Sequence, residues 1–246
     1  MLRYFCLVAM LILAGEFAGA INLLSGPETV VYDSLNNQYL VSNMYSPYYV
    51  VAIDEDGRQS IFKSGLNFPH GMTIANDILY VTTNYNYKGG IFGYDLATGE
   101  MVFSKFLNSW FNSANGLTAD TSGNLYISIF TSEVYRIELL TGLEYKVVNS
   151  MTIPNGLHFD ALNNRILIPG EAWDTHLYVV DASTYVFSSI PVELGMYSCI
   201  TEDQYHNIYV SAFFQNMIYR FNSDFSAPRE LVSSGHSGPE GICFNK

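Results

Sequence analysis

The chain has 246 residues, with 11 basic and 23 acidic side chains and a formal net charge of −12 at pH 7. A protein of this sign repels a phosphate backbone, so the composition argues against nucleic acid as a partner. Hydrophobic residues make up 49% of the chain and charged residues only 14%. Such a chain can bury a large core in one all-β domain. The acidity is also compatible with a cation site, because negative charge raises the local cation concentration.

The first twenty residues have the pattern of a secretory signal peptide. Arg3 precedes an apolar run over residues 4–14, and the small residues 18–20 follow. We therefore predict that residues 1–20 are removed and that the protein is secreted, to the extracellular space or the periplasm. No later stretch approaches the roughly 20 apolar residues of a spanning helix, which argues against a membrane span. Cys199 and Cys243 remain, either as two thiols or as one disulfide bridge.

A repeat of roughly 40 to 45 residues runs through the rest of the chain. Its units start at Pro27, Pro69, Ala114, Pro154, Tyr197 and Pro239. An Asp or Asn follows at the end of the first predicted strand of each unit, where its side chain can bond the backbone two residues further on. These turn residues are Asp33, Asn76 with Asp77, Asp120, Asp160, Asp203 and Asn245. Each unit therefore begins with a strand and a tight turn.

Three more strands follow in a complete unit. In the first unit they cover residues 39–42, 51–54 and 61–63, and they are rich in β-branched and aromatic residues without a helical period. Four strands in a unit of this length are typical of a β-propeller blade. The predicted blades cover residues 26–66, 67–107, 108–150, 151–194 and 195–235.

The two ends of the repeat predict how the ring closes. Residues 21–25 repeat the pattern of the fourth strand at 230–233, so we expect them to act as a closing strand in the last blade. Residues 236–246 start a sixth blade, whose second and third strands are absent. We therefore predict that residues 21–246 form an all-β, six-bladed propeller with an incomplete last blade, from a truncated gene or a fragment. A closed five-bladed ring is the alternative.

The residue after each unit start forms a column of polar side chains. It reads Glu28, His70, Asn115, Asn155, Ser198 and Glu240. The first strand of each propeller blade lines the central channel, so we expect these six side chains to converge there. Carboxylate, amide and hydroxyl oxygens are the ligands that Ca²⁺ selects. Glu28, Asn115 and Asn155 are the predicted ligands of Ca²⁺ or another divalent cation, and Glu240 is expected to line the channel.

Four short phrases carry a resemblance to a known family. They are Gly26-Pro27-Glu28, Phe68-Pro69-His70-Gly71-Met72, Ser113-Ala114-Asn115-Gly116-Leu117 and Ile153-Pro154-Asn155-Gly156-Leu157. With them the chain resembles the six-bladed propellers that include senescence marker protein, gluconolactonase and luciferin-regenerating enzyme, and more loosely the paraoxonases and strictosidine synthase. The resemblance implies a calcium-dependent lactonase, esterase or phosphotriesterase acting on a small lactone or ester at the central channel.

The resemblance also implies roles for single residues. In the family's lactonases a Glu, two Asn and an Asp hold the metal, and the Asp also acts as the base. Glu28, Asn115 and Asn155 match, whereas Ser198 stands at the Asp position and can ligate a metal but cannot take a proton from water at neutral pH. His70 stands in a Pro-His-Gly phrase similar to that of the paraoxonases, where a His is a proposed base. His70 is therefore the candidate catalytic residue, and Ser198 completes the candidate metal set.

A non-catalytic binding propeller is the alternative function. Residues 115–128 read much like an NHL-type repeat, and such a propeller would bind a glycan, peptide or protein at one face. Aromatic residues that flank the strands, among them Trp110 and Trp173, suit such a ligand at the channel mouth. The column would then be no more than a turn repeated with each blade, since Asn before Gly is a common turn pair. The sequence leaves open whether the protein is an enzyme.

Overall fold

The computed structural model describes residues 22–85, 88–108, 113–170, 175–192 and 197–245. The predicted signal peptide, residues 1–20, lies outside the described residues, and so do Trp110 and Trp173. In the part of the chain that is described, no helix is long and apolar enough to cross a membrane.

Within the described residues, twenty strands form five antiparallel sheets, each with four strands in sequence order. Blade 1 contains β1 (Pro27–Asp33), β2 (Gln38–Asn43), β3 (Val50–Asp54) and β4 (Gln59–Lys63). Blade 2 contains β5 (Met72–Ala75), β6 (Ile78–Tyr85), β7 (Lys88–Asp95) and β8 (Met101–Phe106). Blade 3 contains β9 (Ala114–Ala119), β10 (Asn124–Ile129), β11 (Glu133–Glu138) and β12 (Glu144–Val148). Blade 4 contains β13 (His158–Asp160), β14 (Arg165–Pro169), β15 (His176–Asp181) and β16 (Phe187–Pro191). Blade 5 contains β17 (Tyr197–Glu202), β18 (Ile208–Ala212), β19 (Met217–Phe221) and β20 (Glu230–Ser234).

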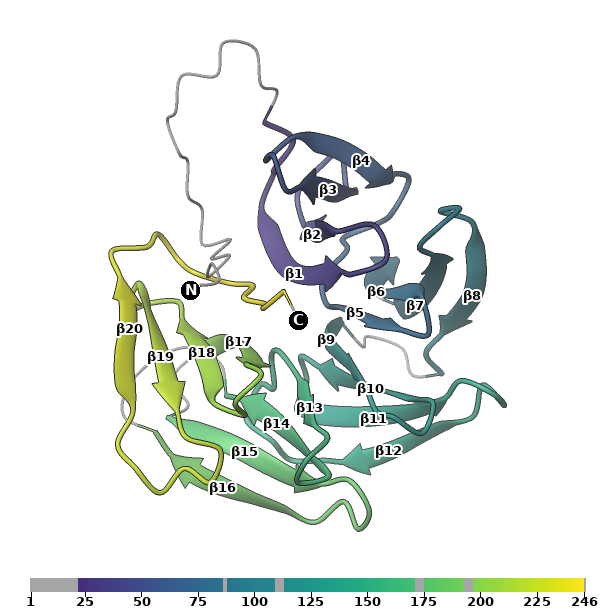
Figure 1. The fold of residues 1–246 in the computed structure, drawn as a ribbon. Coiled ribbons are helices and arrows are strands. Elements are labelled where there is room, and N and C mark those ends of the chain that lie inside the picture. Colours follow the sequence, from purple (N-terminus) through teal and green to yellow (C-terminus); the bar gives the residue numbers. More distant parts are fainter. Residues whose placement is uncertain (1–21, 86–87, 109–112, 171–174, 193–196, 246) are drawn as a thin grey trace.

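The blades are arranged around a centre, with the first strand of each blade innermost (Figure 1). The innermost strands contact one another in chain order: β1 contacts β5, β5 contacts β9, β9 contacts β13, and β13 contacts β17. This arrangement confirms the prediction of an all-β propeller with four-stranded blades. The described residues form the five complete blades that were expected, but the incomplete sixth blade is corrected: its start, in the described residues after Pro239, forms no strand, so the blade count is five.

The predicted Asx turns join the first and second strands. In blade 3, Asp120 Oδ1 accepts hydrogen bonds from the backbone N–H of Ser122 at 2.8 Å and of Asn124 at 2.9 Å. Blade 2 uses a different turn, in which Asn76 and Asp77 have φ values of 51° and 58°. Two consecutive residues with positive φ make a tight hairpin turn that suits the twist of the strands, and Asn and Asp tolerate this conformation.

The core lies between the blades. Four clusters of buried apolar side chains each join two consecutive blades, from blades 1 and 2 through blades 4 and 5. Leu40 of β2 and Leu79 of β6 belong to the first of them, and both are fully buried. A smaller fifth cluster joins blade 5 to Ile242 in the C-terminal segment. Burial between neighbouring sheets therefore holds the propeller together.

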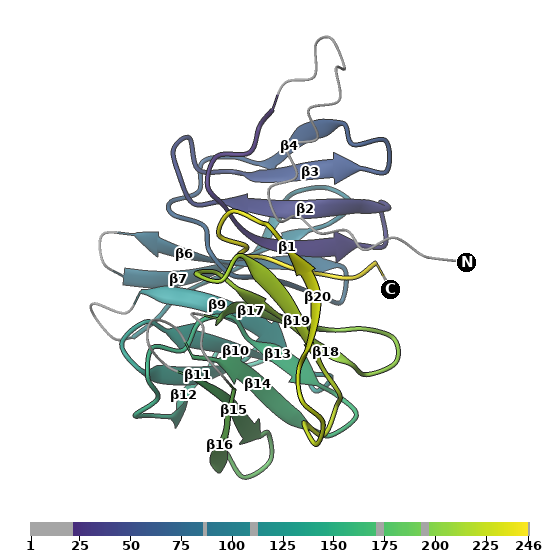
Figure 2. The ribbon, with the colours of Figure 1, turned by 90° about the vertical axis from the view of Figure 1, so that its left-hand side faces the viewer.

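The C-terminal segment fills the place between blade 5 and blade 1. In both views it lies beside β1 (Figure 1 and Figure 2). Ile242 packs on blade 5, and the backbone of Gly241 packs against the backbone of β1 at Glu28 and Val30. The sixth unit, which starts at Pro239, therefore forms an extended segment and not a blade. No strand among the described residues pairs with this segment on the side away from the centre.

Residues 22–25 differ from the predicted closing strand. They are not in a strand, and they bond blade 1 rather than the last blade. The Leu23 carbonyl oxygen accepts a hydrogen bond of 2.7 Å from the Tyr49 hydroxyl, and the Leu23 N–H donates to Gln59 Oε1 at 2.6 Å. A closing strand needs the third strand of an incomplete blade as its partner, and the described residues contain no such strand.

The two cysteines of the predicted mature chain are not joined by a disulfide. Burial raises the pKa of the Cys199 thiol to about 11, so this thiol stays protonated at neutral pH. Cys199 lies in β17, and its sulfur faces the carbonyl oxygen of Ile242 at 3.9 Å. It therefore acts as a small, partly buried apolar side chain between blade 5 and the C-terminal segment.

Candidate functional site

Hydroxyl groups in the second strands hold the polar column in place. Ser42 Oγ of β2 donates a hydrogen bond of 2.7 Å to the carbonyl oxygen of His70. Thr82 Oγ1 of β6 makes the same bond to the carbonyl oxygen of Asn115, also at 2.7 Å. The further bonds of this kind join Ser128 Oγ to the Asn155 carbonyl at 2.5 Å and Ser211 Oγ to the Glu240 carbonyl at 2.7 Å. Each bond connects one blade to the next segment of the ring and so fixes where the next column residue stands.

Blade 4 makes this connection in another way. Pro169 stands at the corresponding place in β14 and has no hydroxyl group to donate. The N–H of Gly156 instead donates a hydrogen bond of 2.9 Å to the carbonyl oxygen of Ser198. The ring of inter-blade bonds therefore continues from blade 4 to blade 5.

The glycine after Asn115 permits this close approach of the strands. A Cβ atom on Gly116 would lie 2.3 Å from the carbonyl oxygen of Asn155 and 2.8 Å from the Cα of Gly156. No side chain fits there without moving the backbone of blade 4. The Asn-Gly pair is thus required by packing between inner strands, and it also places the Asn side chain toward the centre.

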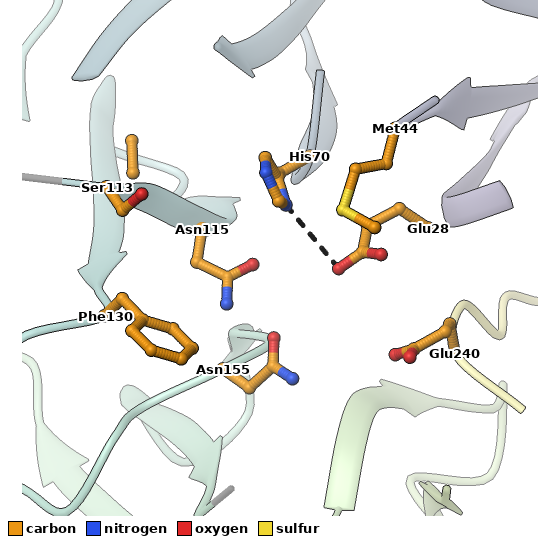
Figure 3. Close-up of a pocket in the computed structure, with 9 residues that line it drawn as sticks. Glu28, Met44, His70, Ser113, Asn115, Phe130, Asn155 and Glu240 are labelled. Carbon is orange, nitrogen blue, oxygen red and sulfur yellow. Dashed lines mark ion pairs between the residues drawn. The ribbon is translucent and has the colours of Figure 1, made fainter. Parts of the chain in front are cut away.

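The column opens onto one pocket of about 190 Å³ at the centre of the ring. Figure 3 shows the polar side chains around this space. The lining residues are Glu28, Met44, His70, Ser113, Ala114, Asn115, Phe130, Asn155 and Glu240. Five of the six column residues therefore meet, which is the convergence expected from the sequence repeat.

Glu28 and His70 are neighbours in this pocket. His70 Nδ1 lies 3.7 Å from Glu28 Oε1, and the two side chains are 19% and 15% exposed. The distance is too long for a hydrogen bond, and the buried Nδ1 has no hydrogen-bond partner in the part of the chain that is described. A buried nitrogen without a partner is costly in a folded protein, so such an atom indicates a place where a ligand, ion or water binds.

Asn115 and Asn155 supply two amide groups to the same pocket. The residues are 8% and 6% exposed, and within the described part of the chain neither side-chain amide has a hydrogen-bond partner. Together with Glu28 they offer the oxygen atoms that a hard cation prefers. No group of three or more His, Cys, Asp or Glu residues in the described ranges is placed to hold a metal. A cation in this pocket would therefore depend on the amide oxygens as well as on carboxylates.

Ser198 is the column residue that does not line the pocket. It is 3% exposed, and its Oγ is buried without a hydrogen-bond partner. Its predicted place in the metal set is therefore not reproduced by the pocket geometry. Glu240 does line the pocket, as expected, and it brings a second carboxylate to it.

Met44 and Phe130 line the pocket and were missed by the sequence reasoning. Both stand two residues after the hydroxyl residue of a second strand, Ser42 in one blade and Ser128 in the other. The repeat could have revealed them, because equivalent positions in different blades face the same axis. Met44 lies beside Glu28 and Phe130 beside Asn155, so apolar side chains line the pocket at two separate places (Figure 3).

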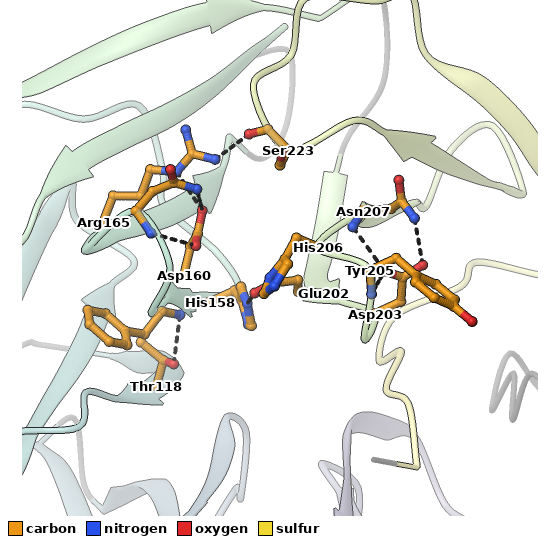
Figure 4. A network of polar contacts seen from close by, with 12 residues as sticks. Thr118, His158, Asp160, Arg165, Glu202, Asp203, Tyr205, His206, Asn207 and Ser223 are labelled. Atoms are coloured by element: carbon orange, nitrogen blue, oxygen red, sulfur yellow. Dashed lines mark hydrogen bonds and ion pairs between the residues drawn. The ribbon is translucent and has the colours of Figure 1, made fainter.

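A second polar cluster lies at the other end of the inner strands (Figure 4). Glu202, at the end of β17, accepts from His158 Nε2 of β13 at 2.9 Å and also contacts His206 Nδ1. Burial raises the pKa of Glu202, but the hydrogen bonds from the two imidazoles outweigh it and leave the pKa below its ordinary value. Glu202 is four residues beyond Ser198, which corresponds to about 13 Å along a strand. The cluster therefore ties blade 4 to blade 5 and is distinct from the pocket.

Comparison with known proteins finds the same fold in solved structures. No protein-family model and no curated protein matches the chain. A structure described as a gluconolactonase is 17% identical with a TM-score of 0.73, covering 92% of this chain and 83% of that one. A chain of a nidogen–laminin complex is 14% identical with a TM-score of 0.72, covering 88% and 83%. Virginiamycin B lyase from Staphylococcus aureus is 13% identical with a TM-score of 0.69, covering 88% and 73%. What they share with this chain is the propeller fold.

Proposed function

We propose that this protein is a divalent-cation-dependent hydrolase that opens a small lactone or cleaves a small ester in the central pocket. The observation that carries the proposal is the meeting of Glu28, His70, Asn115 and Asn155 around one cavity, where His70 Nδ1 is buried and has no hydrogen-bond partner among the described residues. The similarity to a gluconolactonase structure agrees with this class of reaction. The proposed cation is Ca²⁺, because all the available donors are oxygen atoms except the His70 nitrogens.

Glu28, Asn115 and Asn155 would hold the cation, and Glu240, which also lines the pocket, would supply a further carboxylate. A bound divalent cation supplies Lewis acidity, which polarises a carbonyl group and makes water more acidic. These residues also orient the substrate, because the pocket presents polar groups beside the apolar side chains of Met44 and Phe130. The cavity volume of about 190 Å³ favours a small substrate.

His70 is the proposed base. Its imidazole accepts a proton from water as the water oxygen attacks the carbonyl carbon of the substrate. The bond from this carbon to the ring or ester oxygen then breaks, and the leaving oxygen takes the proton back from His70. Glu28, 3.7 Å away, stabilises the imidazolium that forms between these two transfers. The products are a hydroxy acid from a lactone, or an acid and an alcohol from an ester.

We also propose that the protein acts outside the cytoplasm. This rests on the predicted signal peptide at residues 1–20. Extracellular calcium sites commonly have dissociation constants on the order of 10⁻⁴ to 10⁻³ M, and such a site would be filled there. A modest ligand set with two amides is therefore sufficient.

A propeller that binds a ligand without turning it over is the second candidate. The observation that favours it is Ser198, which supplies no carboxylate and lies outside the pocket lining. The similarity to a chain of a nidogen–laminin complex agrees with a binding role. The ligand would be a glycan, a peptide or a protein.

Turnover and calcium binding test the two candidates together. The mature protein is assayed against γ- and δ-lactones and aryl esters, with CaCl₂ or EDTA, and calcium binding is measured by calorimetry. We expect calcium-dependent turnover, which His70→Gln lowers about 10² to 10⁴-fold without loss of the calcium heat. His176→Gln on β15, away from the pocket, is the matched control. Calcium binding without turnover of any substrate would overturn catalysis and favour the binding propeller.

A further inference from the structure

We propose that the cation of the central pocket also closes the ring, by joining the C-terminal segment to blade 1 through Glu240 and Glu28. This segment, Pro239–Asn245, is called the closing segment below. The inference rests on the cation site of the proposed function and adds regulation to it. Assembly of the site and closure of the propeller would then be one event, controlled by calcium.

The closing segment belongs to blade 5 in its packing. Ile242 is 6% exposed and forms an apolar cluster with Tyr209 and Ile218. The ring of Phe244 stacks edge-on against Tyr209, with 4.8 Å between centroids. Ser211 Oγ holds the Glu240 carbonyl at 2.7 Å. Burial and hydrogen bonding therefore anchor the segment on one side.

On its other side the closing segment meets blade 1 through backbone. A Cβ atom on Gly241 would lie 2.8 Å from the backbone nitrogen of Val30 and 2.9 Å from the carbonyl oxygen of Glu28. No apolar cluster of the described residues joins blade 1 to blade 5, in contrast to the four other blade junctions. This junction therefore lacks the burial that stabilises the others.

The pocket places two carboxylates across this junction. Glu28 comes from β1 and Glu240 from the closing segment, and both side chains face the same space (Figure 3). Two carboxylates in one pocket repel each other, which opposes closure when nothing lies between them. A divalent cation between the two carboxylates turns this net repulsion into a net attraction, because both carboxylates are attracted to the cation.

The other wall of the pocket supports a cation at this position. Asn115 and Asn155 are more than nine-tenths buried, and their amides face the pocket and have no hydrogen-bond partner among the described residues. Two carboxylates and two amide oxygens make a ligand set from four parts of the ring. Glu240 thereby takes the part in the metal set that the sequence resemblance gave to the position of Ser198.

Thermodynamic linkage connects the two events. A cation that binds only when Glu28 and Glu240 are brought together stabilises the closed ring, and closure raises the cation affinity by the same factor. At low calcium the closing segment would open more often. At high calcium concentration the cation binds and the closing segment stays against blade 1, so that the site is filled and the ring is closed.

Hydrogen–deuterium exchange of the full mature chain tests this, read on peptides that cover residues 236–245. We expect CaCl₂, compared with EDTA, to slow exchange there by roughly 5- to 150-fold. Glu240→Gln should abolish this calcium effect and weaken calcium binding in calorimetry by roughly tenfold or more. Glu55→Gln, with the same loss of charge in an exposed turn, is the matched control. If Glu240→Gln does not fold, Glu28→Gln gives the same test from the other side of the junction.

The outcomes separate this inference from the proposed function. Calcium heat and turnover with no change of exchange at residues 236–245 would overturn ring closure and leave the hydrolase intact. Unaltered calcium affinity in Glu240→Gln would also overturn it. Absence of calcium heat from the wild-type protein, together with absence of turnover, would overturn both.

Discussion

Ser211 Oγ donates a hydrogen bond of 2.7 Å to the carbonyl oxygen of Glu240, as Ser128 Oγ does to that of Asn155. The first bond joins a blade to a segment without strand pairing, and the second joins two complete blades. The same type of hydrogen bond therefore forms whether or not the accepting segment belongs to a four-stranded sheet. It places the carbonyl of Glu240 at the position that a sixth inner strand would occupy.

Ser211→Ala should loosen the closing segment. Ser211 is fully buried, and its removal leaves the Glu240 carbonyl without this donor, at a cost of about 1 to 3 kcal/mol. Urea unfolding measures the loss, and exchange at residues 236–245 should rise. Ser60→Ala on the exposed face of β4 should change stability by less than about 0.5 kcal/mol. An equal loss for both variants would contradict the role of Ser211.

Gly116→Ala should disturb both stability and the site. The new Cβ would lie 2.3 Å from the Asn155 carbonyl oxygen, so blade 3 and blade 4 must separate. We expect a loss of about 1 to 3 kcal/mol in the free energy of unfolding and weaker calcium binding. Gly90→Ala is the control, because its Cβ would meet only phenylalanine ring atoms, at 3.1 Å or more. Calcium affinity unchanged by Gly116→Ala would mean that Asn155 is not a ligand.

Asp160→Ala should be among the most destabilising single changes. Asp160 is 1% exposed and accepts from Arg165 Nε at 2.7 Å (Figure 4). Removal of one partner leaves a buried guanidinium without its counter-charge, which costs about 3 to 5 kcal/mol. Asp181→Ala, in an exposed turn with the same type of backbone bonds, should destabilise the protein much less. Urea midpoints at pH 7 compare the two.

Glu202 should make stability depend on pH at the acid end. Burial raises its pKa, but the bonds from His158 and His206 outweigh burial, so the folded pKa lies below the ordinary value of 4.5. The unfolded chain then binds a proton first as the pH falls. The contribution of Glu202 to the free energy of unfolding is therefore present above about pH 5. It is lost as the pH falls through the pKa that Glu202 has in the folded protein.

Glu202→Gln checks this by thermal unfolding between pH 3 and pH 7. The variant should be less stable than wild type at pH 7, and the difference should shrink below pH 5. Glu55→Gln again serves as the charge-matched control. A difference that stays constant over the whole range would show that the carboxylate of Glu202 does not titrate with folding.

The repeat was sufficient to predict the propeller, because each blade is built from local signals. The Asx turn at Asp120 and the β-branched and aromatic residues of β10 act within a few residues, and similar signals recur in the other units, with a different tight turn in blade 2. The column followed from the repeat alone, since equivalent residues of a ring face one axis. Glu28, His70 and Asn115 therefore appear in the pocket as expected.

Ring closure could not be predicted, because it depends on contacts between distant segments. The likeness of residues 21–25 to a fourth strand gives no information on which edge they meet. Leu23 is held by Gln59 and Tyr49, two side chains of blade 1 whose positions no repeat pattern specifies. The expectation that Ser198 faces the pocket failed for a similar reason. Its position in the repeat does not reveal that its Oγ is buried away from the pocket.

The separation of the core into clusters between consecutive blades makes the molecule a short linear array bent into a ring. In such an array cooperativity passes only between nearest neighbours. Blade 3 has an apolar interface on both sides, whereas the described residues give blade 1 such an interface only toward blade 2. Unfolding should therefore begin at blade 1 and spread inward, and blade 3 should be the last part of the protein to lose its structure.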